Sequence, residues 1–210
     1  MKIIPWEDNL KKSQKELIIG CLLGDGRLEC RSNSETTRLR IHQADSQKDY
    51  LFWKYDKLKN LVKMMPRMVI YRDKRNRQKY ISWYFHTITT NKLKFFYLMF
   101  YRNRKKVLPM NIADFLTPYS LAIWTMDDGC NSAGSLIYNT HSFSYKNQQK
   151  LIEILDIKFG IKARLNKDRK NYRIRIMKCS MNRLIKMIKP FIVPSMMYKI
   201  VPVTTEVLKN

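Results

Sequence analysis

The feature of this sequence that most constrains its fold is a pair of apolar segments, each ending in an aspartate followed by a glycine. One reads IIGCLLGDG over residues 18–26, and the other reads LAIWTMDDG over residues 121–129. When the two are aligned on the final glycine, Asp25 stands over Asp128. Each segment is apolar on nearly all sides, which predicts a helix that is buried almost completely. The repeat therefore predicts a chain built from two related halves.

Both predicted helices carry a start signal. Ser13–Glu16 reads as a capping box that opens the first helix, which Gly24 or Gly26 is expected to end. The second helix has Thr117 as its N-cap and Pro118 at its first helical position. We therefore expect both apolar segments to be true helices with defined ends.

The segments that follow each motif repeat in the same order. The first half is predicted to have strands at 38–43, 67–73 and 79–87 and helices at 46–62 and 91–101. The second is predicted to have strands at 134–142, 161–167 and 171–177 and helices at 145–160 and 179–191. Each half reads as a helix, a strand pair, a helix, a strand pair and a helix. This order predicts an α+β fold of two pseudo-symmetric αββαββα modules, residues 1–110 and 111–210.

The charge of the chain points to a polyanionic partner. Forty-one Lys and Arg residues against seventeen Asp and Glu residues give a formal net charge of +24. Nucleic acid is the leading candidate, since a surface this positive attracts phosphates. A membrane is not expected, because the basic residues are spread over the whole length and the apolar runs are shorter than the roughly 18 residues of a spanning helix. We expect a soluble, intracellular protein.

Cysteine and histidine usage argues against two other site types. The four cysteines form no close pairs, so neither a disulfide framework nor a zinc site is expected. His42, His86 and His141 are scattered, which disfavours a histidine-metal nuclease centre.

Alternation along the strands predicts a sheet with one apolar and one basic face. Arg38, Arg40 and His42 share one face of their strand, and Leu39 and Ile41 share the other. For any single strand a solvated outer face explains this pattern, but its recurrence in both halves favours a sheet laid into a DNA groove. Two hairpin tips, RDKRNRQK and KDRKN, suit phosphate contacts. The candidate DNA-binding residues are Arg38, Arg40, His42, Arg72, Lys74, Arg75, Arg77, Tyr80, Tyr84, His86, Lys162, Arg164, Asn166, Arg173 and Arg175.

The two apolar segments resemble the paired motif of the LAGLIDADG homing endonucleases, of the single-chain type that carries both motifs. The resemblance covers nearly the whole chain, because the order of strands and helices after each motif also fits that family. It implies that the two motif helices pack side by side between the halves. It further implies that the sheets form a saddle-shaped surface in the DNA major groove, and that the protein acts as a monomer.

The resemblance also implies a metal centre. The motif aspartates, here Asp25 and Asp128, are implied to bind an essential divalent cation, Mg²⁺, for which Mn²⁺ substitutes. Gly24 and Asp127 precede them and are further candidate metal-site positions, with Asp127 in a secondary role at the helix end. The chemistry is consistent, since a helix C-terminus carries partial negative charge and Mg²⁺ is held by a few carboxylates together with substrate phosphates.

Lysines late in each half complete the implied site. The contexts RKKVLP and SMMYKI resemble the family's lysine-bearing segments and point to Lys106 and Lys199 as catalytic residues. Either lysine could polarise the attacking water or stabilise the charge of the transition state. Lys105 adjoins Lys106 and is expected to be a phosphate contact or a solvated charge.

The expected function is site-specific hydrolysis of both strands of a long DNA site, with short staggered 3′ overhangs, in intron homing. Two alternatives remain open. One is an RNA maturase that binds its host intron RNA, and the other is a non-catalytic DNA-binding regulator. The paired aspartates and lysines favour the nuclease, because a binding protein needs no paired metal ligands. A mitochondrion or other organelle is the expected location, and otherwise the cytoplasm.

Overall fold

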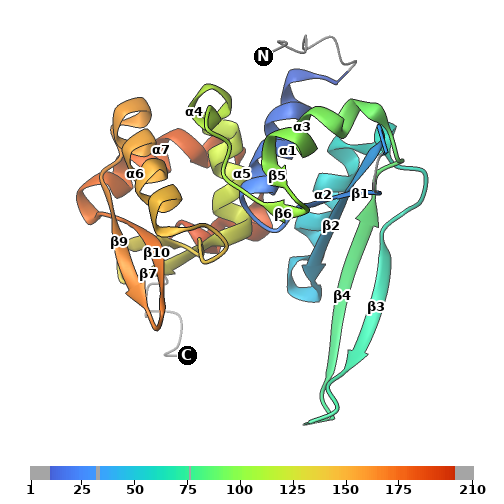
Figure 1. Cartoon of the computed structure of the whole chain (residues 1–210). Helices are drawn as coiled ribbons and strands as arrows, with labels where there is room; N and C mark the ends of the chain where they lie inside the picture. The colour runs from blue at the N-terminus through green and yellow to red at the C-terminus, as the bar shows by residue number, and fades with distance from the viewer. Residues whose placement is uncertain (1–9, 32–33, 76, 202–210) are drawn as a thin grey trace. The chain divides into compact units, whose positions relative to one another are not determined.

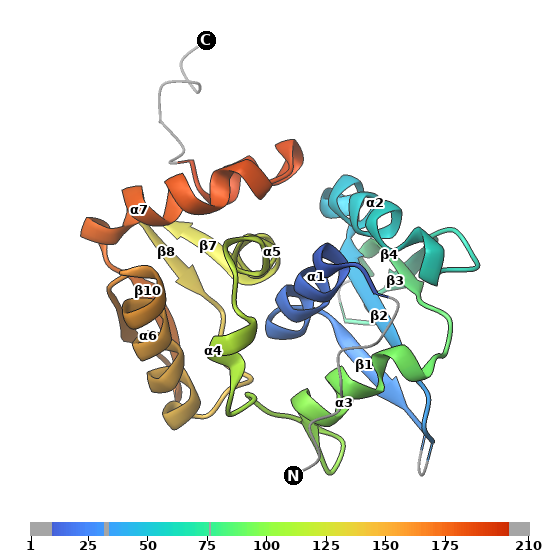
Figure 2. The ribbon, with the colours of Figure 1, turned by 90° about the horizontal axis from the view of Figure 1, so that it is seen from above.

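The computed structural model describes residues 10–31, 34–75 and 77–201. The chain forms two compact units, Met1–Pro109 and Met110–Asn210 (Figure 1). Each unit contains a four-stranded antiparallel sheet with helices packed against it (Figure 2). None of the described helices combines the length and the apolar character that crossing a membrane requires.

The first unit follows the predicted order of elements. Its main elements are α1 (Lys12–Leu23), β1 (Arg27–Cys30), β2 (Thr37–Ala44), α2 (Lys48–Lys57), β3 (Arg67–Arg72), β4 (Lys79–His86) and α3 (Lys94–Phe100). The strands are arranged in the order β1-β2-β4-β3. A short hairpin that the sequence did not predict follows α3, formed by β5 (Tyr101–Arg102) and β6 (Lys105–Lys106).

The second unit repeats this topology. After the short α4 (Ile112–Phe115) come α5 (Pro118–Asp128), β7 (Gly129–Ser132), β8 (Ser135–Tyr138), α6 (Tyr145–Phe159), β9 (Ala163–Asp168), β10 (Asn171–Ile176) and α7 (Lys178–Ile188). The 3-10 helix η5 (Pro194–Lys199) follows. The strand order is β7-β8-β10-β9, which is equivalent to that of the first sheet. The predicted α+β class and the repeated αββαββα order are confirmed.

The two motif helices begin differently. The start of α5 is as predicted: Pro118 is the first helical residue, and the Thr117 hydroxyl accepts a hydrogen bond from the Ser120 N–H. The predicted start of α1 is wrong by two residues, because Lys11 is the N-cap and its N–H donates to Oε1 of Gln14 over 3.2 Å.

Tertiary contacts explain the earlier start of α1. The amide of Gln14 also donates to the Lys57 carbonyl oxygen over 3.0 Å and to Oδ1 of Asn60 over 2.6 Å. These two bonds join the first turn of α1 to the end of α2 and hold Gln14 at the third helical position. Ser13 therefore lies inside the helix instead of capping it.

Both motif helices lie in the core of their units, as their composition predicts. The last seven residues of α1 are buried, and so is α5 from Ser120 to Asp127. In the second unit Trp124 stacks on Tyr138 with ring centroids 4.1 Å apart, and the Tyr138 hydroxyl is hydrogen-bonded to Thr125. Burying these apolar side chains anchors each helix end at a defined place in its unit.

The outer hairpin of the first unit is the main exception to burial. All six residues of β3 are exposed, as are the first three of β4. Figure 1 shows this hairpin extending beyond the helices of its unit. Both faces of the hairpin are therefore open to solvent or to a partner.

Candidate functional site

The carboxyl end of α1 brings Asp25 to the surface of the first unit. The helix ends with Gly24 as its cap, and the Gly26 N–H donates to the Cys21 carbonyl oxygen over 2.7 Å. A Cβ at Gly26 would lie 2.8 Å from that same oxygen, so the turn requires glycine. Asp25 is exposed at this turn, where the amide of Gln43 on β2 donates to its Oδ2 over 3.2 Å.

The carboxyl end of α5 is built in a similar way. The helix ends at Asp128, and the Gly129 N–H donates to the Thr125 carbonyl oxygen. A Cβ at Gly129 would lie only 2.4 Å from that oxygen. Asp128 is half-buried, whereas Asp127 is buried with 6% of its surface exposed. Of the two adjacent carboxylates, Asp128 is thus the more accessible.

The two predicted lysines occupy equivalent places in their units. The Lys106 ammonium donates to the carbonyl oxygens of Gly24 over 2.8 Å and Gly26 over 3.3 Å. The Lys199 ammonium donates to the carbonyl oxygen of Gly129, the residue equivalent to Gly26, over 2.7 Å. Each lysine therefore places a positive charge at the negative end of a motif helix, next to the motif aspartate.

Different elements position the two lysines. Lys106 lies on β6 and pairs with Tyr101, whose hydroxyl accepts a hydrogen bond from the Leu28 N–H of β1 over 3.1 Å. That bond ties the β5–β6 hairpin to the strand that follows the motif. The neighbouring Lys105 is exposed. Lys199 is the last residue of η5, which packs beside β7.

The helix ends suit a divalent cation in the chemical type of their ligands. Asp25 and Asp128 supply carboxylate oxygens at the negative ends of two helices, and Mg²⁺ prefers such oxygens together with waters and substrate phosphates. The Gly24 carbonyl, a further candidate position, already accepts a hydrogen bond from Lys106. In the described parts of the chain no three His, Cys, Asp or Glu residues gather as a ready-made metal site. The remaining ligands of a bound ion would therefore have to include water or substrate.

The first sheet has the polar face that its alternation predicts. Along β2 the buried Leu39 and Ile41 alternate with residues that are exposed or half-buried. The strand register then places the candidates of β2 and β4 on one face, with Arg40 opposite His86 and His42 opposite Tyr84. This shared face, which we call the first polar face, carries Arg38, Arg40, His42, Tyr80, Tyr84 and His86, and also Arg67 of β3.

The candidates at the tip of the β3–β4 hairpin are exposed. Lys74 is exposed, and Arg75 pairs with Asp73 at 3.1 Å. Arg77 has a positive φ of 56°, and its N–H donates to the Asp73 carbonyl oxygen over 2.8 Å, which closes the turn. Arg72 pairs with Lys79, whose side chain is on the opposite face of the sheet from that of Tyr80. Arg72 is therefore not part of the first polar face.

The second sheet has an equivalent polar face. Arg173 lies opposite Asn166, and Arg175 lies opposite Arg164. These four residues are the second polar face. Lys162 precedes β9, and its ammonium donates to Oδ2 of Asp156 on α6 over 2.7 Å. Its charge is thus engaged by a carboxylate of α6.

Burial and neighbouring arginines favour the neutral form of two histidines on the first polar face. Burial, and then the charge of Arg40, lower the pKa of His42. Burial and the charge of Arg38 likewise lower the pKa of His86, although the Glu29 carboxylate opposes them. A neutral imidazole can both donate and accept a hydrogen bond, so it can contact either kind of group on a base edge.

Three polar residues near these surfaces are absent from the predicted set. Gln43 contacts Asp25, Glu29 contacts Arg38, and Asp168 contacts His141. Gln43 lies on the same buried face of β2 as Leu39 and Ile41, so a polar residue on an apolar face was the signal for it. Glu29 lies on β1, which the sequence did not predict as a strand.

Comparisons with known proteins show which family the chain belongs to. A model of the LAGLIDADG DNA endonuclease family matches residues 15–184 of the chain. Over 209 residues the chain is 35% identical to the DNA endonuclease I-ChuI of Chlamydomonas applanata, a match that covers 91% of this chain and 96% of that protein. Over 207 residues it is 33% identical to the cytochrome b mRNA maturase bI2 of Debaryomyces hansenii, covering 94% of this chain and 77% of that protein.

The fold is also similar to that of a solved structure. The homing endonuclease I-WcaI, in the structure in which it is bound to its DNA recognition sequence, superposes with a TM-score of 0.87 at 24% sequence identity. The match covers 91% of this chain and 87% of that one. Because the identity is low, the likeness concerns the fold.

Proposed function

Because the chain belongs to the LAGLIDADG DNA endonuclease family, we propose that it is a metal-dependent, site-specific endonuclease that cuts both strands of a DNA duplex. One observation supports this proposal above the others. An aspartate follows the end of α1 and another is the last residue of α5, and a lysine donates to the carbonyl oxygen of the glycine after the aspartate in both units. A protein that only binds DNA has no need for two equivalent pairs of this kind.

The polar faces support DNA as the substrate. Arginines and neutral histidines on adjacent strands present donors and acceptors at the spacing of a pleated sheet, which the major groove can accommodate. Lys74, Arg75 and Arg77 at the hairpin tip suit the phosphate backbone, since contacts to phosphate position a protein without reading sequence. The net charge of +24 adds a long-range attraction for the duplex.

We propose that Asp25 in the first unit and Asp128 in the second are ligands of divalent cations, Mg²⁺ or Mn²⁺, with Gly24 and Asp127 beside them. When bound, the ion stabilises the negative charge that develops on the phosphate and lowers the pKa of a coordinated water. Lys106 and Lys199 contribute fixed positive charge next to each aspartate, and each also orients the turn that carries it. We propose cleavage with short staggered 3′ overhangs, as in intron homing.

Replacing the aspartates tests this function. Asp25→Asn and Asp128→Asn keep the shape of the side chain but remove the negative charge on which Mg²⁺ binding depends. We expect each variant to lose double-strand cleavage almost completely and still to bind the duplex. Asp114→Asn on α4, which changes an exposed carboxylate away from the motifs, is the matched control and should cleave like the wild type. If both motif variants cleave normally, the catalytic assignment is wrong.

RNA maturation is a second candidate, favoured by the likeness to the maturase of Debaryomyces hansenii, which extends over 94% of this chain. The same polar faces could bind a folded intron. If the wild type cuts no duplex in Mg²⁺ but promotes intron splicing, and both Asn variants splice normally, this second function replaces the first. A non-catalytic DNA-binding regulator is the remaining alternative, and site-specific binding without either activity would identify it.

We also propose that the protein acts as a monomer on DNA. A single chain contains both copies of the motif, each with its own sheet, aspartate and lysine. A second chain would duplicate every one of these parts.

A further inference from the structure

Each polar face contains a carboxylate, although a surface that binds a polyanion should gain from having none. On the first sheet this residue is Glu29 of β1, which pairs with Arg38 of β2. The next pair on the same face of the sheet is Arg27 with Arg40, so three arginines lie around one glutamate. The side chain of Glu29 is only 19% exposed.

The contacts of Glu29 hold one arginine more firmly than the other two. Nε of Arg38 donates to Oε2 over 2.8 Å, and a terminal nitrogen of the same guanidinium lies 2.7 Å from that oxygen. Arg27 and Arg40 approach Oε1 at 3.8 Å and 3.9 Å. Burial alone would raise the pKa of Glu29, but the hydrogen bond and the charge of Arg38 outweigh it and lower this pKa. The glutamate is therefore ionised at neutral pH and opposes part of the arginine charge.

Two of the arginines around Glu29, Arg27 and Arg38, also line a concave surface. A cavity of about 970 Å³ in the first unit is bordered by Arg27, Glu29, Arg31, Arg38 and Arg104. Among the described residues that line it, Glu29 is the one carboxylate. Without that charge, the cavity would be a strong and sequence-independent attractor for any backbone phosphate.

The second sheet carries a similar carboxylate. Asp168, the last residue of β9, lies 2.7 Å from Nε2 of His141 and 3.4 Å from Nε of Arg173. The hydrogen bond from His141 lowers the pKa of Asp168, and Arg173 adds to this effect. An arginine of the second polar face is thus in ion-pair contact with an acid, at a longer distance than Arg38 on the first and without a hydrogen bond from its Nε.

We propose that Glu29 and Asp168 are specificity-determining residues that position Arg38 and Arg173 and keep them from binding phosphates indiscriminately. This inference rests on the proposed function. A carboxylate competes with any phosphate for the guanidinium, and it leaves the N–H groups that it does not bind available to base edges. The carboxylate thereby lowers affinity for random DNA more than affinity for the correct site. The ratio of affinity for the correct site to affinity for random DNA is therefore higher.

Glu29→Gln tests the inference, since it removes the charge and keeps the shape. We expect the variant to bind a random-sequence duplex more tightly than the wild type. The slope of log affinity against log salt for that duplex should become more negative by about 0.9, corresponding to one additional phosphate contact. The cognate duplex is first obtained by selection with the wild type. The ratio of affinity for this duplex to affinity for random DNA should then fall about fivefold or more, because fivefold is the smallest effect expected when one well-oriented arginine contact to a base is lost.

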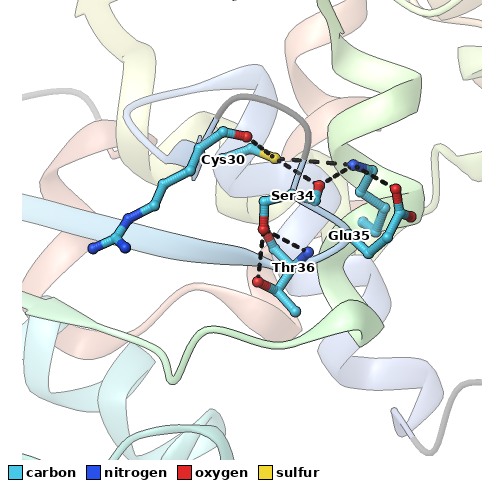
Figure 3. A network of polar contacts seen from close by, with 6 residues as sticks. Cys30, Ser34, Glu35 and Thr36 are labelled. Carbon is cyan, nitrogen blue, oxygen red and sulfur yellow. Dashed lines mark hydrogen bonds and ion pairs between the residues drawn. The ribbon is translucent and has the colours of Figure 1, made fainter.

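Glu35→Gln is the matched control. Glu35 lies just before β2, its side chain is 86% exposed, and it pairs with Lys94 at 3.8 Å (Figure 3). The substitution changes the net charge of the same unit by the same amount, but away from the first polar face. It should leave the salt slope and the sequence preference at their wild-type values. If Glu35→Gln and Glu29→Gln have equal effects, bulk charge explains them and the inference is wrong.

Two further measurements separate the remaining outcomes. In the free protein, the Arg38 Nε–H should give a slowly exchanging NMR signal that Glu29→Gln abolishes and Glu35→Gln preserves; a signal unchanged in Glu29→Gln contradicts the positioning role.

Asp168→Asn provides an independent variant in the second unit and should reproduce the loss of preference. A wild type without sequence preference overturns the proposed function. A wild type with a preference that both variants retain overturns this inference alone.

Discussion

Single side chains at the two helix ends account for the candidate chemistry. Asp25 is exposed just before Gly26, where the turn is too tight for a side chain, and Asp128 lies just before a similarly restricted glycine. A lysine bound to the turn carbonyl then sets a positive charge beside each carboxylate. The arrangement combines a ligand for a cation with a group that stabilises anionic charge, at a place defined by the backbone.

At this scale we predict that the lysines act in cleavage more than in binding. Lys106→Met and Lys199→Met keep most of the length of the side chain but each removes one of forty-one basic charges. Single-turnover cleavage should slow by about a hundredfold or more, as when one stabilising donor is removed from an active site, while affinity for the duplex changes little. Lys105→Met, the exposed neighbour, is the control and should cleave at nearly the wild-type rate. Cleavage rates that are unchanged in both variants would show that other lysines serve this role.

Short elements, more than the long helices, decide where the candidate residues lie. The β5–β6 hairpin carries Lys106 back to the end of α1, and η5 carries Lys199 to the end of α5. The strands β1 and β7 begin directly after the motif turns and tie the helix ends to the sheets. The geometry of the candidate site therefore depends on the turns as much as on the helices.

At the scale of elements we predict that the turn after α5 tolerates only glycine. In Gly129→Ala the new Cβ would lie 2.4 Å from the Thr125 carbonyl oxygen and 3.2 Å from a methyl group of Leu136. The free energy of unfolding should fall by about 1–3 kcal/mol, as is usual when atoms are forced into a packed site. Cleavage should slow as well, because the carbonyl that Lys199 contacts belongs to the same residue.

Gly134→Ala is the comparison for this prediction. The free energy of unfolding of both variants is measured by chemical denaturation. Gly134 has a φ of +75°, but a Cβ there would meet only the end of Lys178 at 3.9 Å. Its substitution should cost stability through backbone strain and leave cleavage unchanged. If Gly129→Ala proves as active as Gly134→Ala, the turn does not position the site.

The whole molecule duplicates one topology in a strongly basic chain. The two sheets have equivalent strand orders, and each carries a polar face with an embedded acid. The net charge of +24 gives both units an attraction for nucleic acid. A single chain therefore holds two similar surfaces and two similar helix ends, one of each per unit.

At this scale we predict one chain per duplex. Sedimentation equilibrium of the purified complex with a cognate duplex should give the mass of one 25.3 kDa chain plus the DNA, over a wide range of protein concentration. The reason is that both motifs and both sheets are already present in one polypeptide. A complex with two chains per cognate site would contradict this prediction.

The sequence by itself determined the class of fold and the main candidate residues, because these depend on local patterns. Apolar periodicity marked the motif helices, alternation marked the faces of β2 and β10, and the repeated Asp-Gly ends singled out Asp25 and Asp128. Thr117 and Pro118 marked the start of α5 correctly, since an N-cap is a contact within a few residues.

Only the tertiary structure decided the contacts between residues distant in the sequence. Gln14 is joined to the end of α2, so α1 starts at Lys12 and Ser13 does not cap it. The four-residue strands β1 and β7 and the two-residue strands of the β5–β6 hairpin are too short to show a period, so the place of Glu29 could not be predicted. The same holds for the bonds from Lys106 and Lys199 to the motif turns, which span 82 and 70 positions of the chain. Such contacts arise because packing, and not sequence proximity, brings these groups together.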